Sequence, residues 1–109
     1  MAFEKIVGFL KALADETRLS IVDFIKTGPK ESIEIQDALG KSQSTVSQHL
    51  KILVEQAILE YEQKKIRKFY KIKDPQVTKI ILMIQGYLAK QSKEDIKDMQ
   101  EFTISSTLD

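Results

Sequence analysis

Two helices joined by a short turn that contains a glycine constrain the fold of this chain more than any other feature. The segment Ile33–Leu39 is short and amphipathic, and Gly40 after it can adopt a positive φ and end a helix. Ser42 can then cap a second helix, predicted over Ser42–Val54, through its side-chain oxygen. Helix, three-residue turn and helix together form the helix-turn-helix pattern.

The second of these helices has one apolar face and one polar face. Val46, Leu50 and Leu53 recur at helical spacing and predict the buried face. Short hydroxyl and amide side chains can donate and accept hydrogen bonds, which suits contacts with base edges and phosphates in the major groove. The alternative is an ordinary polar surface helix. The candidate DNA-binding residues here are Ser42, Gln43, Ser44, Thr45, Ser47, Gln48 and Lys51.

Basic charge gathers on this helix and on the segment that follows it. The whole chain has a net charge of only +1. Residues 41–73, however, carry eight basic and three acidic groups, a net charge of +5. Such a local excess is what contact with phosphate needs.

Two short alternating segments, Leu59–Gln63 and Arg67–Lys73, predict a β-hairpin. The residues between them include neither Asn-Gly nor Gly-Gly, so we expect a longer and mobile loop. Beside a helix-turn-helix, a hairpin with a basic tip is interpreted as a DNA-contacting wing, and solvated surface charge is the alternative. The basic residues at the tip are Lys64, Lys65, Arg67 and Lys68.

The predicted helices at the two ends, Phe3–Ala14 and Val77–Lys90, are more apolar than the edge of a small domain requires. Ordinary core packing would explain part of this excess for the first helix, but a contact between two copies of the chain is the preferred interpretation. The candidate dimerisation residues are Phe3, Ile6, Phe9, Leu10, Leu13, Ile80, Ile81, Ile84, Tyr87 and Leu88.

The chain has 109 residues, enough for one small domain. We expect residues 1–91 to form a DNA-binding and dimerisation domain, and residues 92–109 to form a short helix or a frayed tail. No apolar run is long enough to cross a membrane, and no export signal is visible, so the cytoplasm is the expected location. The fold class is mainly α, with five or six helices and a two-stranded hairpin.

Three segments in this order resemble the ArsR/SmtB-type winged-helix transcriptional repressors. They are ALADETRLSIVDFI, IQDALGKSQSTVSQHLKILVEQAILE and the basic hairpin that ends in FYKI. The resemblance covers roughly Val7–Asp74. It implies a homodimer built from the first and last long helices, with the Ser42–Leu53 helix in the major groove and the wing in the minor groove.

The chain departs from this family at the positions that sense metals. Where many members carry a Cys-x-Cys pair, Glu31 and Ile33 stand here, and the chain has no cysteine and one histidine. A zinc or arsenic site needs several soft or imidazole ligands, so neither a metal nor any other cofactor is expected. His49 is interpreted as a packing or capping residue, with a DNA phosphate contact as the alternative.

These patterns favour a dimeric, sequence-specific regulator of transcription, in the role of a repressor, that binds an inverted repeat in double-stranded DNA without metal. The alternative is a winged-helix module that binds another protein of the transcription or chromosome machinery. An enzyme is not expected, because no nucleophile–base pair, glycine-rich phosphate loop or metal cluster is visible.

Overall fold

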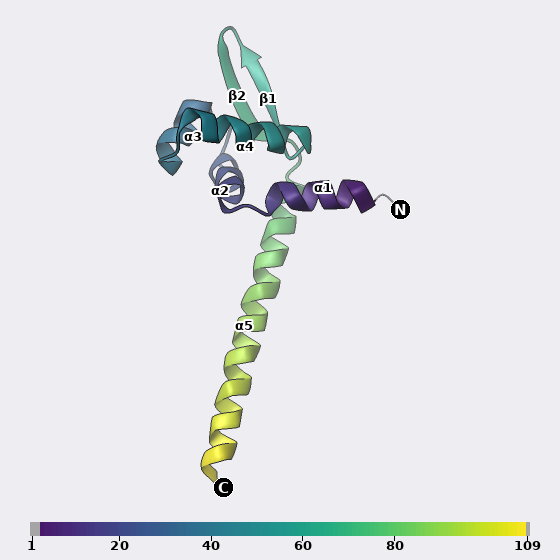
Figure 1. Cartoon of the computed structure of the whole chain (residues 1–109), viewed down its shortest axis with the longest axis vertical. Coiled ribbons are helices and arrows are strands. Elements are labelled where there is room, and N and C mark those ends of the chain that lie inside the picture. Colours follow the sequence, from purple (N-terminus) through teal and green to yellow (C-terminus); the bar gives the residue numbers. More distant parts are fainter. Residues whose placement is uncertain (1–2, 109) are drawn as a thin grey trace. The chain divides into compact units, whose positions relative to one another are not determined.

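The structure, a computed structural model, describes the backbone of residues 3–108 and the side chains of residues 3–93. The described residues form five helices and one antiparallel hairpin (Figure 1), which confirms the predicted winged-helix class. In chain order the elements are α1 (Phe3–Leu13), α2 (Glu16–Ile25), α3 (Ser32–Leu39), α4 (Gln43–Glu55), β1 (Leu59–Lys64), β2 (Arg67–Ile72) and α5 (Gln76–Leu108).

The chain divides into two compact units, Met1–Thr78 and Lys79–Asp109. In the first unit α2 is the central helix, since it contacts α1, α3, α4 and β2. Nine apolar side chains, each at most 2 % exposed, fill the space between these elements and exclude water from it. They are Ile21, Val22, Ile25, Ile35, Val46, Leu50, Leu53, Ile58 and Leu59.

Three local features define ends of the central helices, and those at Gly40 and Ser42 were predicted from the sequence. The Asp15 carboxylate accepts a hydrogen bond from the Arg18 backbone N–H at 2.9 Å and caps α2. The Ser42 hydroxyl accepts one from the Thr45 N–H and caps α4. Between α3 and α4, Gly40 has a φ of +64°, the left-handed conformation that glycine adopts without a Cβ clash. The turn predicted between the two helices is therefore present.

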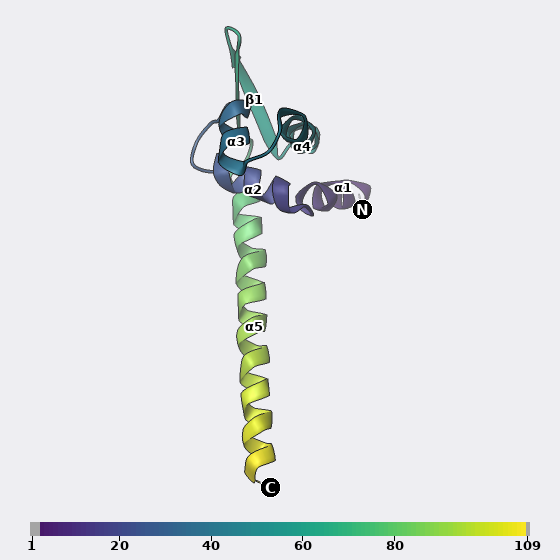
Figure 2. The ribbon, with the colours of Figure 1, turned by 60° about the vertical axis from the view of Figure 1, so that its left-hand side comes forward.

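The hairpin has a tighter turn than the sequence predicted. β1 and β2 pair from Leu59 opposite Ile72 as far as Lys64 opposite Arg67, so that only Lys65 and Ile66 connect the strands. The expectation of a longer, mobile loop is wrong, because Lys65 adopts a φ of +59° and supplies the bend that glycine or asparagine usually supplies. In two views the hairpin extends beyond α3 and α4 (Figures 1 and 2).

One residue shortly before α3, Lys30, pairs with β2 as an isolated bridge. Lys30 pairs with Tyr70 of β2 through two backbone hydrogen bonds of 2.9 and 2.8 Å. The helix α3 then begins at Ser32. The Glu34 carboxylate accepts a hydrogen bond from the Glu31 N–H at 2.8 Å, which supports this helix start.

The last helix continues without a break from Gln76 to Leu108. The sequence predicted a helix over 77–90 and a separate short helix or frayed tail over 92–109. The backbone shows one helix instead. The predicted end of the DNA-binding and dimerisation domain at residue 91 stays a prediction. The side chains of residues 94–109, which make up most of that predicted short helix or tail, lie outside the described residues. Among the described residues, no helix is long and apolar enough to span a membrane.

Candidate nucleic-acid interface

The two faces of α4 differ in burial as the sequence predicted. Val46, Leu50 and Leu53 are buried against the rest of the first unit, at 0 to 2 % exposure. On the opposite side five predicted DNA-binding residues are exposed to solvent: Gln43, Ser44, Ser47, Gln48 and Lys51. The apolar face therefore holds the helix in place and leaves its polar face available to a ligand.

Three of the predicted residues at the start of α4 already have partners within the chain. The Ser42 hydroxyl accepts the Thr45 N–H at 3.2 Å and donates to the Thr45 hydroxyl at 2.9 Å. A third contact of 3.3 Å joins the Ser42 and Ser44 hydroxyls. Ser42 and half-buried Thr45 thus stabilise the first turn of the helix, which is what places the side chains that follow.

The four basic residues of the wing (β1, β2 and their turn) do not form one uniform cluster. The Arg67 guanidinium donates two hydrogen bonds to the Glu31 carboxylate, at 2.9 and 2.6 Å. The Lys68 ammonium lies 3.8 Å from the centroid of the Tyr61 ring and 5.5 Å from that of Tyr70. Lys64 and Lys65 remain at the exposed tip.

The acidic partners on and beside the wing reduce its local positive charge. The hydrogen bonds from Arg67 hold the pKa of Glu31 below its usual value. Lys71 donates to Glu62 at 2.6 Å and lies 3.7 Å from Glu60, and the hydrogen bond lowers the pKa of Glu62. Glu31 and Glu62 are therefore ionised at neutral pH, and each offsets part of the positive charge of the wing.

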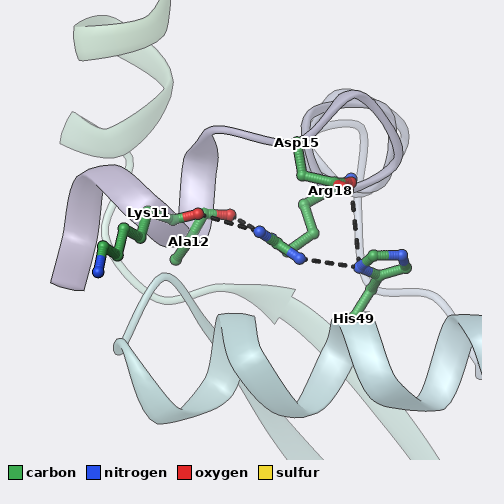
Figure 3. A network of polar contacts seen from close by, with 5 residues as sticks. All are labelled: Lys11, Ala12, Asp15, Arg18 and His49. Carbon is green, nitrogen blue, oxygen red and sulfur yellow. Dashed lines mark hydrogen bonds and ion pairs between the residues drawn. The ribbon is translucent and has the colours of Figure 1, made fainter.

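Arg18 links α1, α2 and α4 through one guanidinium group (Figure 3). Its Nε donates to the Ala12 carbonyl at 2.5 Å and its Nη2 to the Lys11 carbonyl at 3.0 Å, at the end of α1. Its Nη1 lies 3.1 Å from Nδ1 of His49 on α4, and Nδ1 accepts this hydrogen bond when the imidazole is neutral with its proton on Nε2. The Asp15 carboxylate lies 4.0 Å from the same nitrogen.

This arrangement supports the packing role predicted for His49, whose side chain is only 19 % exposed. Sequence reasoning did not find the role of Arg18, because its partner is 31 positions away in the chain. It also missed the pairing of Glu31 with Arg67, which are 36 positions apart. In neither case does a local pattern mark the two residues as neighbours.

The predicted dimerisation residues of α1 do not all lie on its surface. Phe3, Ile6 and Leu10 are 67, 47 and 51 % exposed, and Phe9 is half-buried. Leu13 is only 7 % exposed, since its side chain packs into the core of the first unit and adds nothing to the exposed apolar surface.

The second unit carries its own exposed apolar side chains on α5. Ile80, Ile84, Tyr87 and Leu88 are between 40 and 62 % exposed, and Ile81 is half-buried. Leu82 and Met83, which are not among the predicted dimerisation residues, are even more exposed than Ile80 and Ile84, at 57 and 73 %. Apolar exposure thus extends around most of this part of the helix.

Comparison with known proteins assigns this fold to a family. Residues 15–61 match the family described as bacterial regulatory protein, arsR family. The chain is 35 % identical over 83 residues to MJ1325, an uncharacterized HTH-type transcriptional regulator of Methanocaldococcus jannaschii, and the match covers 75 % of this chain and 93 % of that protein. This chain belongs to the ArsR family. By family it is a DNA-binding transcriptional regulator and not an enzyme, as the sequence predicted.

A second relative of this ArsR-family chain is a probable mercury resistance operon repressor of Streptomyces lividans. The two are 38 % identical over 77 residues, which are 69 % of this chain and 60 % of the repressor. The ArsR-family chain therefore matches well under two thirds of that relative's length.

Solved structures of similar proteins have the same winged-helix architecture. One is the homodimeric winged helix-turn-helix DNA-binding domain of Mb0332 from Mycobacterium bovis, a possible ArsR-family transcriptional regulator. It has a TM-score of 0.74 and 25 % identity, and the match covers 81 % of this chain and 82 % of that one. Another is the transcriptional repressor PagR of Bacillus anthracis, with a TM-score of 0.66, 32 % identity, and coverage of 77 % and 97 %.

Proposed function

We propose that the ArsR-family chain is a dimeric repressor that binds a specific sequence in double-stranded DNA and does so without metal. The exposed polar face of α4 carries this proposal. A helix held by a buried apolar face, with exposed Gln43, Ser47 and Gln48 near its N-terminus, matches the geometry of a helix that reads base edges in the major groove.

The wing supplies the second contact in this proposal. Lys64 and Lys65 lie at an exposed tip, where long cationic side chains reach phosphates or the minor groove. Arg67 and Lys68 contribute less, because Glu31 and Tyr61 already engage their charged groups. We therefore assign positioning on DNA mainly to the first two lysines.

Dimerisation is supported by the exposed apolar residues of α1 and of α5 and by the homodimeric Mb0332 domain. Contact between two copies would remove this surface from water, which is favourable. A symmetric dimer binds two half-sites in an inverted repeat, with centres about 10 base pairs, or a multiple of that, apart.

Metal independence is supported by the donor atoms of the chain. It has no cysteine, and soft metal ions such as mercury prefer thiolate ligands. Its one histidine already contacts Arg18 through Nδ1. We expect the affinity for the operator to be the same with EDTA and with added Zn²⁺. A saturable change at one equivalent of Zn²⁺ would contradict this part of the proposal.

The experiment that tests the proposal compares two variants on two DNAs over a series of salt concentrations. The two DNAs are an operator duplex, selected from a random-sequence pool with the wild-type protein, and a random duplex. Gln48→Ala should lose about 1–3 kcal/mol of binding free energy on the operator and little on random DNA, because contacts with base edges determine which sequence is bound. Lys65→Ala should weaken binding to both DNAs, because phosphate contacts position the protein on any duplex. It should also reduce the salt slope, which is the change of log affinity with log salt concentration, by about one unit.

Equal losses on both DNAs for Gln48→Ala would show that α4 does not read the sequence. Absence of any salt-dependent DNA binding by the wild-type protein would reject the DNA-binding proposal and favour the protein-interaction module. The cytoplasmic location expected from the sequence stays a prediction.

A further inference from the structure

Ile66, at the tip of the wing, is the most exposed large apolar residue that the structure describes. It is 95 % exposed, and it occupies the second position of the two-residue turn between Lys64 and Arg67. Lys65 before it adopts a φ of +59°, the left-handed conformation that is unfavourable for a residue with a Cβ. The tight turn thus presents an isoleucine to solvent at the point farthest from the paired ends of the strands.

The structure holds this tip in place relative to the helix-turn-helix. Lys30, just before α3, makes two backbone hydrogen bonds to Tyr70 of β2. The Arg67 guanidinium, directly after the turn, pairs with Glu31 at the start of α3. Each contact fixes the second strand of the wing near the start of the helix that precedes α4, so the wing has a defined position relative to the helix-turn-helix.

The charges around Ile66 indicate what it can approach. Lys64 and Lys65 precede it at the exposed tip, whereas Arg67 and Lys68 are engaged by Glu31 and Tyr61. An apolar side chain next to two available cations fits a narrow groove bordered by negative charge. The minor groove of B-DNA is about 6 Å wide and lies between two rows of phosphates.

We propose that Ile66 enters the minor groove beside each half-site and favours A·T base pairs there. This inference rests on the proposed DNA-binding function. In the minor groove a G·C pair presents the guanine 2-amino group, a donor that an isoleucine would desolvate without a hydrogen bond. An A·T pair has no such group, so the apolar side chain is tolerated at lower cost. Ile66 would then contribute to specificity although it makes no hydrogen bond.

The experiment uses the full chain and a duplex selected from a random-sequence pool with the wild-type protein. The base pairs that flank each half-site are set to A·T, to G·C or to inosine·C. Inosine lacks the 2-amino group, so its minor groove resembles that of A·T, while its major-groove acceptors remain those of guanine. The measured quantity is the ratio of affinities among the three duplexes for one protein.

The wild-type protein should bind the A·T and inosine·C duplexes about three- to tenfold more tightly than the G·C duplex. In Ile66→Ala the ratio should fall below about twofold, because the shorter side chain does not reach the floor of the groove. The matched control is Ile33→Ala, which removes another exposed isoleucine, 55 % exposed and located on α3. That variant should keep the wild-type ratio.

The inference fails if Ile66→Ala keeps the wild-type ratio, or if the wild-type protein binds the three duplexes equally. The protein could also bind the three duplexes equally and bind vesicles of anionic phospholipid in a way that depends on Ile66. That result would assign the tip to a membrane surface and overturn the inference. In each of these cases the operator is still bound, so the proposed function survives. If the wild-type protein binds no duplex, the proposed function fails, and this inference fails with it.

Discussion

Arg18 shows at the scale of one residue how the helix that faces the proposed ligand is positioned. Its guanidinium donates to two carbonyls at the end of α1 and to the imidazole of His49 on α4. Cationic donors at the C-terminus of a helix satisfy carbonyls that lack helical partners and complement the helix dipole. One side chain therefore joins a helix of the proposed dimer surface to the proposed DNA-reading helix.

Replacement of Arg18 by lysine should lower the free energy of unfolding by about 1–3 kcal/mol. Lysine keeps the charge, but one ammonium cannot reach both carbonyls and His49 with the geometry of a guanidinium. Urea unfolding followed by circular dichroism measures the change. The control is Lys26→Ala, which removes a half-exposed ion pair with Asp23 and should cost less than about 0.5 kcal/mol. Equal costs for the two variants would contradict a linking role for Arg18.

Asp15 makes stability depend on pH. The hydrogen bond from the Arg18 N–H, followed by the charge of Arg18, lowers the pKa of its carboxyl below the usual value. Because the pKa is lower in the folded state than in the unfolded state, the carboxylate stabilises the fold above the usual pKa of aspartate. That stabilisation is lost as the pH falls through the folded value.

Asp15→Asn should therefore be less stable than the wild type at neutral pH, and the difference should shrink below about pH 4. Asparagine still caps a helix, so the comparison isolates the charge. Urea unfolding of both proteins between about pH 7 and about pH 3 gives the measurement. A difference that stays constant over this range would show that the carboxylate charge does not stabilise the fold.

The wing shows how two requirements meet in one element. Its turn needs a residue with positive φ at position 65, and the proposed DNA contact needs a cation near the same place. Asparagine would satisfy the first requirement better than lysine, because its short polar side chain tolerates the left-handed conformation. Lysine satisfies the second requirement at some cost in stability.

Lys65→Asn should raise the free energy of unfolding by about 0.5–1 kcal/mol and lower the salt slope of DNA binding by about one unit. Lys64→Asn is the matched control, since Lys64 pairs with Arg67 at the end of β1 and does not have a positive φ. It should lower the salt slope without raising stability. The interpretation of the turn is wrong if both variants change stability equally.

At the scale of the whole molecule, the proposed dimer rests on the exposed apolar residues of each unit. Ile84 and Leu88 on α5 are 47 and 56 % exposed. The double variant Ile84→Glu and Leu88→Glu should be a monomer in sedimentation, whereas the wild-type protein should be a dimer at tens of micromolar, roughly where a micromolar Kd already gives dimer. Gln85→Glu places a charge on the same helix at an exposed polar position, and that variant should remain a dimer.

A monomeric wild-type protein at that concentration would contradict the proposal. Because the substituted side chains are exposed, the double variant is expected to keep its helical content, which circular dichroism checks on the same sample. A loss of folding in the double variant would show that these residues also stabilise the chain itself.

The sequence by itself determined the order of the elements and the faces of α4. Helical spacing marked Val46, Leu50 and Leu53 as buried, and local chemistry marked Gly40 and Ser42 as helix ends. Such features depend on residues within about one helical turn, so the pattern alone predicts them. The family resemblance rested on the same segments.

The tertiary structure alone decided which basic side chains of the wing are engaged by other residues of the chain and how tight the turn of the wing is. Arg67 and Arg18 find partners that are more than 30 positions away, and no local pattern encodes those distances. The packing of Leu13 and the positive φ of Lys65 likewise depend on neighbouring elements and on the pairing of two strands. Long-range contacts form only when the chain closes on itself, and for that reason the sequence indicated a basic wing without showing that Lys64 and Lys65 are its available cations.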